Sequence, residues 1–242
     1  MHPLHAATGP WDPGFQNGVA LSGLMAHVFE TTPSAEGMDV ARFHIDILKP
    51  TPMRPFRITV TPVRDGRRLQ VLDAELRVDG ELTARASAVR LRRAETPTAS
   101  VGPPPAPPEA WPPRLLSPRR PIFSLVESRQ RQGADGAIGS GAVWFRITGD
   151  IVEGCPITPF VQMALVSDMG SGQARVVDYR THTFANIDIS VNLARAPRGD
   201  WVLLESEAVS HGEGRALVNT LLSDRQGEFA RAHQTLFIDP RG

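Results

Sequence analysis

The chain has little of several features that would narrow its class at once. Cysteine occurs once among 242 residues, at Cys155, so an intramolecular disulfide cannot form. Lys plus Arg and Asp plus Glu both number 26, so the formal net charge is zero. Bulk charge therefore favours neither nucleic acid nor an acidic membrane surface as a partner. No stretch approaches the roughly 20 apolar residues that a membrane helix needs, so we expect no membrane insertion.

The single cysteine and the N-terminal segment both favour an intracellular protein. A lone thiol fits the reducing cytosol, where structural disulfides are rare. Residues 1–11 contain no basic region followed by an apolar run, which is the pattern of a signal peptide. We therefore predict a soluble, cytoplasmic protein.

Common catalytic signatures are also missing. The sequence has no Gly-x-Ser-x-Gly elbow of the α/β hydrolases and no Gly-rich phosphate loop before a helix. Its histidines show no metal-ligand spacing, since His211 and His233 fall on separate predicted strands. We expect no metal site. Cys155 lies in a Gly-Cys-Pro turn without an obvious partner, and we interpret it as structural.

A proline-rich segment divides the chain into two parts of similar size. It includes Val101-Gly-Pro-Pro-Pro-Ala-Pro-Pro and Trp111-Pro-Pro, neither of which can sustain a helix or a central strand. Such a composition is typical of a semi-rigid, extended connector. We predict an N-terminal domain at residues 1–95, a linker at 96–121 and a C-terminal domain at 122–242.

The two parts repeat one order of elements. In the first part, residues 18–30 are apolar at helical spacing, and alternating runs follow with hairpin signals at Asp65-Gly66 and Asp79-Gly80. In the second part, a strand at 140–148 and a helix at 159–168, which Gly170 and Gly172 can end, precede strands at 183–195, 201–210, 215–222 and 229–239. A helix followed by an antiparallel meander, twice, predicts an α+β duplication.

Several segments resemble the corresponding segments of TesB-like acyl-CoA thioesterases in their amino-acid sequence. They are Gly9-Pro-Trp-Asp-Pro through Gln16-Asn-Gly18, Val143-Trp-Phe-Arg-Ile, Ser167-Asp-Met-Gly-Ser-Gly172, Asn186-Ile-Asp-Ile-Ser-Val, Arg195-Ala-Pro-Arg-Gly-Asp-Trp201 and Ala232-His-Gln-Thr-Leu-Phe237. The resemblance spans nearly the whole chain outside the linker. It implies two tandem hotdog domains, each an antiparallel sheet wrapped around one helix. It also implies hydrolysis of acyl-CoA thioesters to free acid and CoA by an activated water, without metal or organic cofactor.

The resemblance further implies how the molecule assembles. A double hotdog mimics a dimer of single hotdogs, and the outer sheet faces of such proteins often pack again. We therefore expect a homodimer or a larger assembly. The sequence leaves open whether CoA or an acyl carrier protein carries the acyl group.

The same resemblance places candidate chemistry on strands of the second repeat. In bacterial thioesterases of this family an Asp, a Ser or Thr, and a Gln hold the attacking water. Asp188 matches the Asp, and Gln234 matches the Gln. The hydroxyl position falls at Val209 without a gap, and Ser210 is the nearest hydroxyl. Gln234 shares its strand face with apolar residues, so its amide must find hydrogen bonds, whereas Asp188 shares its face with polar residues, as on a solvated surface.

Helix ends supply further candidates. Asn17 and Gly18 precede the first helix, where backbone N–H groups can bind an oxyanion or a phosphate. Asn17 can equally be an ordinary N-cap, and Asn-Gly-Val here replaces the family's His-Gly-Gly. Asp168 follows the apolar run of the second helix. Some hotdog thioesterases use a helix carboxylate as base or nucleophile, but we interpret Asp168 as part of a helix-end turn with Gly170 and Gly172.

Three functions compete on this pattern. The first, which we predict, is acyl-CoA hydrolysis. The second is a non-catalytic protein that binds acyl thioesters in a degenerate hotdog site, and the change at Asn17 and the unsettled hydroxyl position favour it. The third is hydration of enoyl-CoA, which uses a Gly-Asp-x-Asn-Pro-x-His type turn. Asp178-Tyr-Arg-Thr-His182 lacks that spacing and the Asn-Pro pair.

Overall fold

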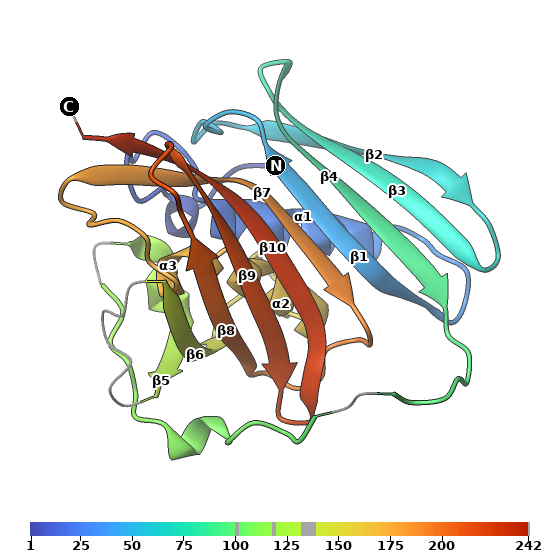
Figure 1. Ribbon diagram of the computed structural model, residues 1–242. Coiled ribbons are helices and arrows are strands. Elements are labelled where there is room, and N and C mark those ends of the chain that lie inside the picture. The colour runs from blue at the N-terminus through green and yellow to red at the C-terminus, as the bar shows by residue number, and fades with distance from the viewer. Residues whose placement is uncertain (100–101, 118–119, 132–138, 242) are drawn as a thin grey trace.

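One continuous antiparallel sheet of ten strands forms the body of the protein in the computed structural model, which describes residues 1–99, 102–117, 120–131 and 139–241 (Figure 1). The strand order is β2-β3-β4-β1-β7-β10-β9-β8-β6-β5. The first half contains α1 (Gly18–Thr31), β1 (Met38–Ile47), β2 (Phe56–Asp65), β3 (Leu69–Val78) and β4 (Glu81–Arg92). The second half contains β5 (Val126–Gln130), β6 (Ser140–Ile147), α2 (Pro159–Ser167), α3 (Gly170–Gln173), β7 (His182–Leu193), β8 (Val202–Val209), β9 (Arg215–Asp224) and β10 (Gly227–Pro240). Among the described residues, three short 3-10 turns lie at His5–Ala7, Pro108–Ala110 and Pro121–Leu125.

The local pattern of the sequence explains most of these elements. Alternating apolar residues form strands whose buried side chains face one side, as in β3, where Leu72, Ala74 and Leu76 are all buried. The predicted hairpin between β3 and β4 is confirmed. Asp79 and Gly80 both adopt positive φ, 49° and 84°, which matches the twist of the strands on either side.

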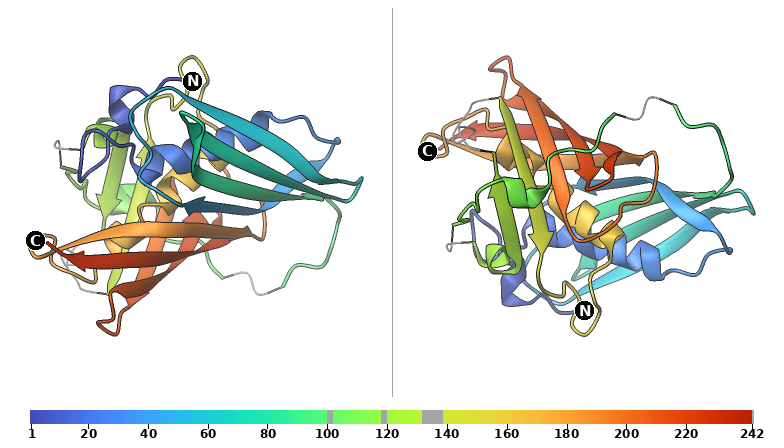
Figure 2. Two further views of the ribbon diagram at one scale, coloured as in Figure 1. Left: turned by 90° about the horizontal axis from the view of Figure 1, so that it is seen from above. Right: turned by 90° about the horizontal axis from the view of Figure 1, so that it is seen from below.

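The two repeats join at the edges of their sheets. β1 pairs with β7, and the buried pairs Phe43–Val191 and Ile45–Ile189 continue the core across the junction. The curved sheet wraps α1 and α2 on its inner side (Figure 2). A Cβ built on Gly23 of α1 would lie 2.5 Å from the Cγ of Leu165 in α2, so the helices pack very closely. The helices α1 and α2, one from each repeat, and the duplicated antiparallel sheet confirm the predicted double hotdog fold.

Two details differ from the prediction. β5 was not expected, because Val126–Gln130 is short and carries charged side chains; it forms as the sheet's edge by pairing with β6. Gly170 does not end α2. The helix ends at Ser167 with Asp168 as its C-cap, and Gly170–Gln173 forms its own short helix α3.

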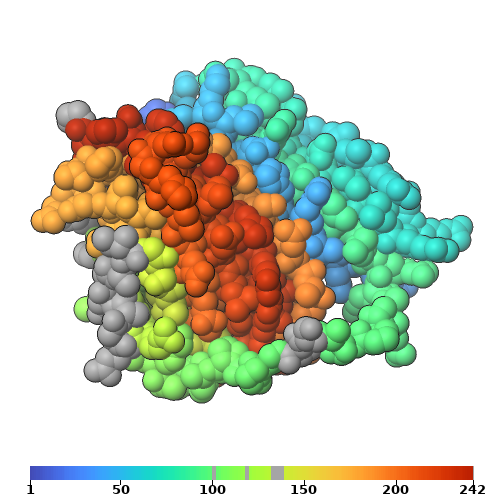
Figure 3. Space-filling model, in the orientation of Figure 1, coloured from blue at the N-terminus to red at the C-terminus, as the bar shows by residue number. Residues whose placement is uncertain are grey.

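The proline-rich segment crosses the surface and is anchored to the second half of the chain at several points, which include the ion pair of Glu109 with Arg225 and the bridge of Pro113 with Arg129. It runs along the lower edge of the molecule (Figure 3). Trp111 is buried against Trp144 and Trp201, and Nε1 of Trp144 donates a hydrogen bond of 3.1 Å to the carbonyl of Ala106. In the described part of the chain, no helix is long and apolar enough to cross a membrane.

Candidate active site

A carboxylate lies where the two repeats meet. Asp168 is the C-cap of α2 and is half-buried. A Cβ built on Gly18, the first residue of α1, would lie 2.4 Å from Oδ1 of Asp168. The carboxylate therefore rests directly against the first turn of a helix from the other repeat, and any side chain at position 18 would displace it.

Two side-chain amides of the sheet hold Asp168 in place. Nδ2 of Asn186, on β7, donates to Oδ1 of Asp168 at 2.8 Å and to its backbone carbonyl at 3.0 Å. Nε2 of Gln234, on β10, donates to the same carbonyl at 3.2 Å. The remaining amide oxygens of Asn186 and Gln234 are buried, and the described residues offer neither of them a donor. A buried acceptor left unpaired costs roughly 1–3 kcal/mol, so both oxygens are suited to accept a hydrogen bond from a water or ligand.

The short helix α3 closes the site from one side. A Cβ on Gly170 would lie 2.6 Å from Oε1 of Gln234 and 2.7 Å from Oγ1 of Thr220. Thr220 is itself hydrogen-bonded to Ser206, with 2.9 Å between the two hydroxyl oxygens. Glycine at position 170 thus lets the helix backbone approach a buried polar layer contributed by β8, β9 and β10.

The surroundings of Asp168 tune its acidity. Burial raises the pKa of Asp168 to about 6, while the hydrogen bond from Asn186 and the nearby positive charge of Arg120 act in the opposite direction. A carboxyl group with a pKa near neutral pH can take up and release a proton under physiological conditions. A perturbed pKa of this kind is typical of functional sites.

The start of α1 offers hydrogen-bond donors beside the carboxylate. Oδ1 of Asn17 accepts from the N–H of Ala20 at 2.7 Å, which makes Asn17 the N-cap. Its Nδ2 donates to two backbone carbonyls of the N-terminal segment. The backbone N–H groups of Gly18 and Val19 find no acceptor among the residues that the structure describes. They are free donors at the positive end of the helix.

Two residues expected at the site lie elsewhere. Asp188 on β7 pairs with Thr235 on β10, and its side chain lies on the outer face of the sheet. Its Oδ1 accepts a hydrogen bond of 2.9 Å from the N–H of Thr235. Gln234, one residue earlier on β10, faces the helices, so the two side chains cannot share one water. Ser210 lies in the exposed β8–β9 turn, where its hydroxyl donates to the carbonyl of Arg215 at 3.0 Å.

A β-bulge explains why Asp188 is displaced. In the β7–β10 ladder, Thr235 pairs with Asp188 but Leu236 pairs with Asn186, so Ile187 is the extra residue. The bulge reverses the alternation, and Asn186 therefore faces the helices on the same side as Ile189. The alternating sequence of β7 gives no sign of the bulge. For Asp168 the sequence did give a signal, because the Ser-Asp-Met-Gly-Ser-Gly segment predicts a tight helix end.

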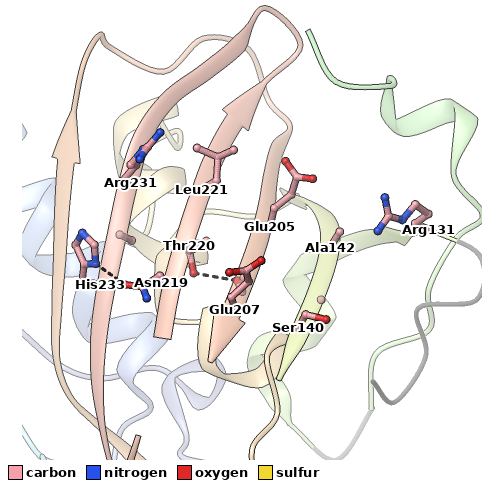
Figure 4. A pocket seen from close by; sticks show the side chains of 13 residues that line it. Arg131, Ser140, Ala142, Glu205, Glu207, Asn219, Thr220, Leu221, Arg231 and His233 are labelled. Carbon is pink, nitrogen blue, oxygen red and sulfur yellow. Dashed lines mark hydrogen bonds between the residues drawn. The ribbon is translucent and has the colours of Figure 1, made fainter. Parts of the chain in front are cut away.

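Two hollows lie outside this site. One, of about 230 Å³, is mostly apolar and borders α1 at Ala20 and Leu24. The other, of about 940 Å³, lies on the outer face of β8, β9 and β10 (Figure 4). Its polar lining includes His233, whose Nδ1 is 2.7 Å from Oδ1 of Asn219. Within the described residues, no group of three or more His, Cys, Asp or Glu side chains could hold a metal ion.

Comparison with known proteins relates the whole chain to one family. A model of the acyl-CoA thioesterase N-terminal domain matches residues 7–91, and a model of the acyl-CoA thioesterase C-terminal domain matches residues 92–238. No curated protein matches the chain.

Several solved structures have the same fold. A putative thioesterase from Novosphingobium aromaticivorans is 22% identical, with 98% of this chain and 92% of that chain covered and a TM-score of 0.73. The acyl-CoA thioesterase II TesB2 from Mycobacterium marinum is 20% identical, with coverages of 93% and 91% and a TM-score of 0.73. A conserved hot dog protein of unknown function from Alicyclobacillus acidocaldarius is 18% identical, with coverages of 99% and 92% and a TM-score of 0.77. At these identities the likeness concerns the fold.

Proposed function

The chain belongs to the acyl-CoA thioesterase family, whose N-terminal and C-terminal domains it matches in order, and on that basis we propose that it hydrolyses acyl-CoA thioesters with Asp168 as general base. One observation carries the assignment of Asp168. Its carboxylate lies against Gly18, the first residue of α1, and is held by Asn186 and Gln234, whose own buried oxygens lack donors among the described residues.

The first step of the proposed reaction activates a water. The water donates one hydrogen bond to Asp168 and another to the amide oxygen of Asn186 or Gln234, so that a lone pair points at the thioester carbon. As the oxygen attacks, the carboxylate takes the water's proton. A pKa of about 6 keeps Asp168 mostly ionised at pH 7 and above, as this role requires.

The second step stabilises the charge that develops on the carbonyl oxygen. The N–H groups of Gly18 and Val19 lie at the positive end of α1 and are free to bind the oxyanion. The C–S bond then breaks, and the CoA thiolate takes the proton from Asp168. The products are the free acid and CoA, and the Asp168 carboxylate is regenerated. The apolar hollow beside Ala20 and Leu24 provides space for an acyl chain near this helix end.

The test compares two aspartates of the same repeat. Asp168→Asn should lower kcat by about 10²–10⁴, because the general base is removed. Asp188→Asn is the matched control: it keeps an Oδ1 that can accept from Thr235, lies on the outer sheet face and should retain near wild-type turnover. Hydrolysis is followed with a thiol-trapping dye over a panel of acyl-CoAs of different chain length.

The opposite ranking of the two variants would overturn the assignment of Asp168. A wild-type protein that binds an acyl-CoA by calorimetry and hydrolyses none of the panel would instead favour the non-catalytic binding function.

A further inference from the structure

Three aromatic rings form a cluster beside the site. Trp11, Tyr179 and Phe184 come from the N-terminal segment, the connection after α3 and the start of β7. The ring centroids of Trp11 and Phe184 are 5.7 Å apart, and those of Tyr179 and Phe184 are 5.4 Å apart. Trp11 is nonetheless 40% exposed. The rings therefore build a firm platform that still faces solvent.

Three guanidinium groups cover this platform. Arg241 lies 5.1 Å and Arg120 5.8 Å from the ring of Trp11, and Arg175 lies 5.7 Å from the ring of Tyr179. Neither Arg120 nor Arg241 forms an ion pair with a residue that the structure describes. A chain of zero net charge thus gathers three cations around these rings, two of which have no ion-pair partner among the described residues. We call these six residues the arginine–aromatic cluster.

The cluster adjoins the catalytic carboxylate. Phe184 is two residues before Asn186 on β7, and Trp11 belongs to the segment that leads into Gly18. Arg120 is close enough to Asp168 to stabilise its negative charge. The C-terminus, which follows Arg241, and α3 lie at the same end of the molecule (Figure 1). The cluster and the candidate site therefore lie at the same end of the molecule.

We propose that the arginine–aromatic cluster binds the phosphate groups of CoA, an inference that rests on the proposed function. Guanidinium groups are the preferred partners of phosphate, because their planar donors match its oxygens. Stacking on aromatic rings holds them extended without neutralising their charge. CoA carries a diphosphate and a 3′-phosphate, whereas the arm of an acyl carrier protein carries a single phosphodiester. The guanidinium groups of Arg120 and Arg241 suit the more highly charged carrier.

The experiment compares two thioesters that share an acyl group, one of CoA and one of pantetheine, which lacks the phosphates. In Arg120→Gln/Arg241→Gln, the ratio of kcat/KM for acyl-CoA to kcat/KM for acyl-pantetheine should fall about tenfold, equivalent to the loss of ~1.4 kcal/mol of binding. The ratio cancels any effect of Arg120 on Asp168. Arg129→Gln is the control, because Arg129 also lies over a tryptophan, 5.9 Å from the ring of Trp201, in a different cluster.

An unchanged ratio in the double variant would overturn the inference. So would a selective loss of activity toward an acyl carrier protein thioester, which would make that protein the ligand. If the wild type hydrolyses neither thioester, the proposed hydrolysis fails while the inference is still tested: the affinity for CoA, measured by calorimetry, should fall about tenfold in the double variant. Arg241→Gln alone, at an exposed position near the C-terminus, serves if the double variant does not fold.

Discussion

At the scale of single residues, the proposed role of Asp168 depends on its ionisation. Its desolvated position raises its pKa to about 6, although a hydrogen bond from Asn186 favours the charged form. By contrast, exposed Asp178 binds Arg180, and that contact lowers its pKa to about 2. Only the first of these carboxyl groups changes charge close to neutral pH.

We therefore expect kcat/KM to depend on pH with an acid limb near pH 6. The general base must be ionised, and its ionised fraction falls as the pH drops through its pKa. Activity should decline about tenfold per pH unit below that point and level off above it. Steady-state rates from pH 4.5 to 8.5 on a stable acyl-CoA measure the profile. A flat profile across pH 5–7 would exclude Asp168 as the titrating base.

At the scale of elements, the position of α3 depends on Gly170, because a residue with a side chain would not fit there. Gly170 faces the polar layer of Gln234 and Thr220, with no room for a Cβ. Gly172, in the same helix turn, has open space where a Cβ would be placed. A side chain therefore fits at position 172 but not at position 170, although the two glycines are close in sequence.

Gly170→Ala should lower turnover at least about tenfold and destabilise the fold by about 1–3 kcal/mol, because the new methyl group displaces the amide of Gln234 or the whole of α3. Gly172→Ala is the matched control and should leave activity unchanged, with stability equal or slightly higher, since alanine favours a helix. Chemical denaturation and acyl-CoA hydrolysis of both variants check this pair. Equal behaviour of the two variants would show that α3 is not packed against the site.

At the scale of the whole molecule, the site exists only because two repeats form one sheet. The pairing of β1 with β7 sets the two helices side by side, which brings Gly18 of the first repeat to Asp168 of the second. Neither half contains both the proposed general base, Asp168, and the N–H groups of Gly18 and Val19. The division into separate domains at residues 1–95 and 122–242 stays a prediction, and the shared site suggests that such domains would act only together.

The predicted homodimer has a suitable surface on the outer sheet face. Val209 and Leu217 pair directly across β8 and β9 and are 53% and 58% exposed, with Phe237 on the neighbouring strand 52% exposed. Apolar side chains grouped on adjacent strands favour association. We expect a dimer or a larger assembly by light scattering at micromolar concentration, shifted toward monomer by Leu217→Lys. Leu115→Lys, at a 97% exposed linker position, is the control that should remain dimeric. A monomeric wild type would refute the expectation.

The sequence by itself determined the elements and their order, because these follow from short-range effects. Alternation of apolar residues predicts β1 to β4, the Asp79-Gly80 pair predicts a tight hairpin, and the repeat of helix and meander predicts the duplication. Gln234 was also accessible to this reasoning, since a polar amide on an apolar strand face needs partners.

Only the tertiary structure decided which residues meet at the candidate site. Alternation cannot reveal the bulge at Ile187, because a bulge depends on how β7 pairs with β10, and one extra residue moves Asn186 rather than Asp188 to the helix side. The neighbours of Asp168 likewise come from a distant helix and two strands. Contacts between segments far apart in the chain are set by sheet register and helix packing, which leave no local pattern in the sequence.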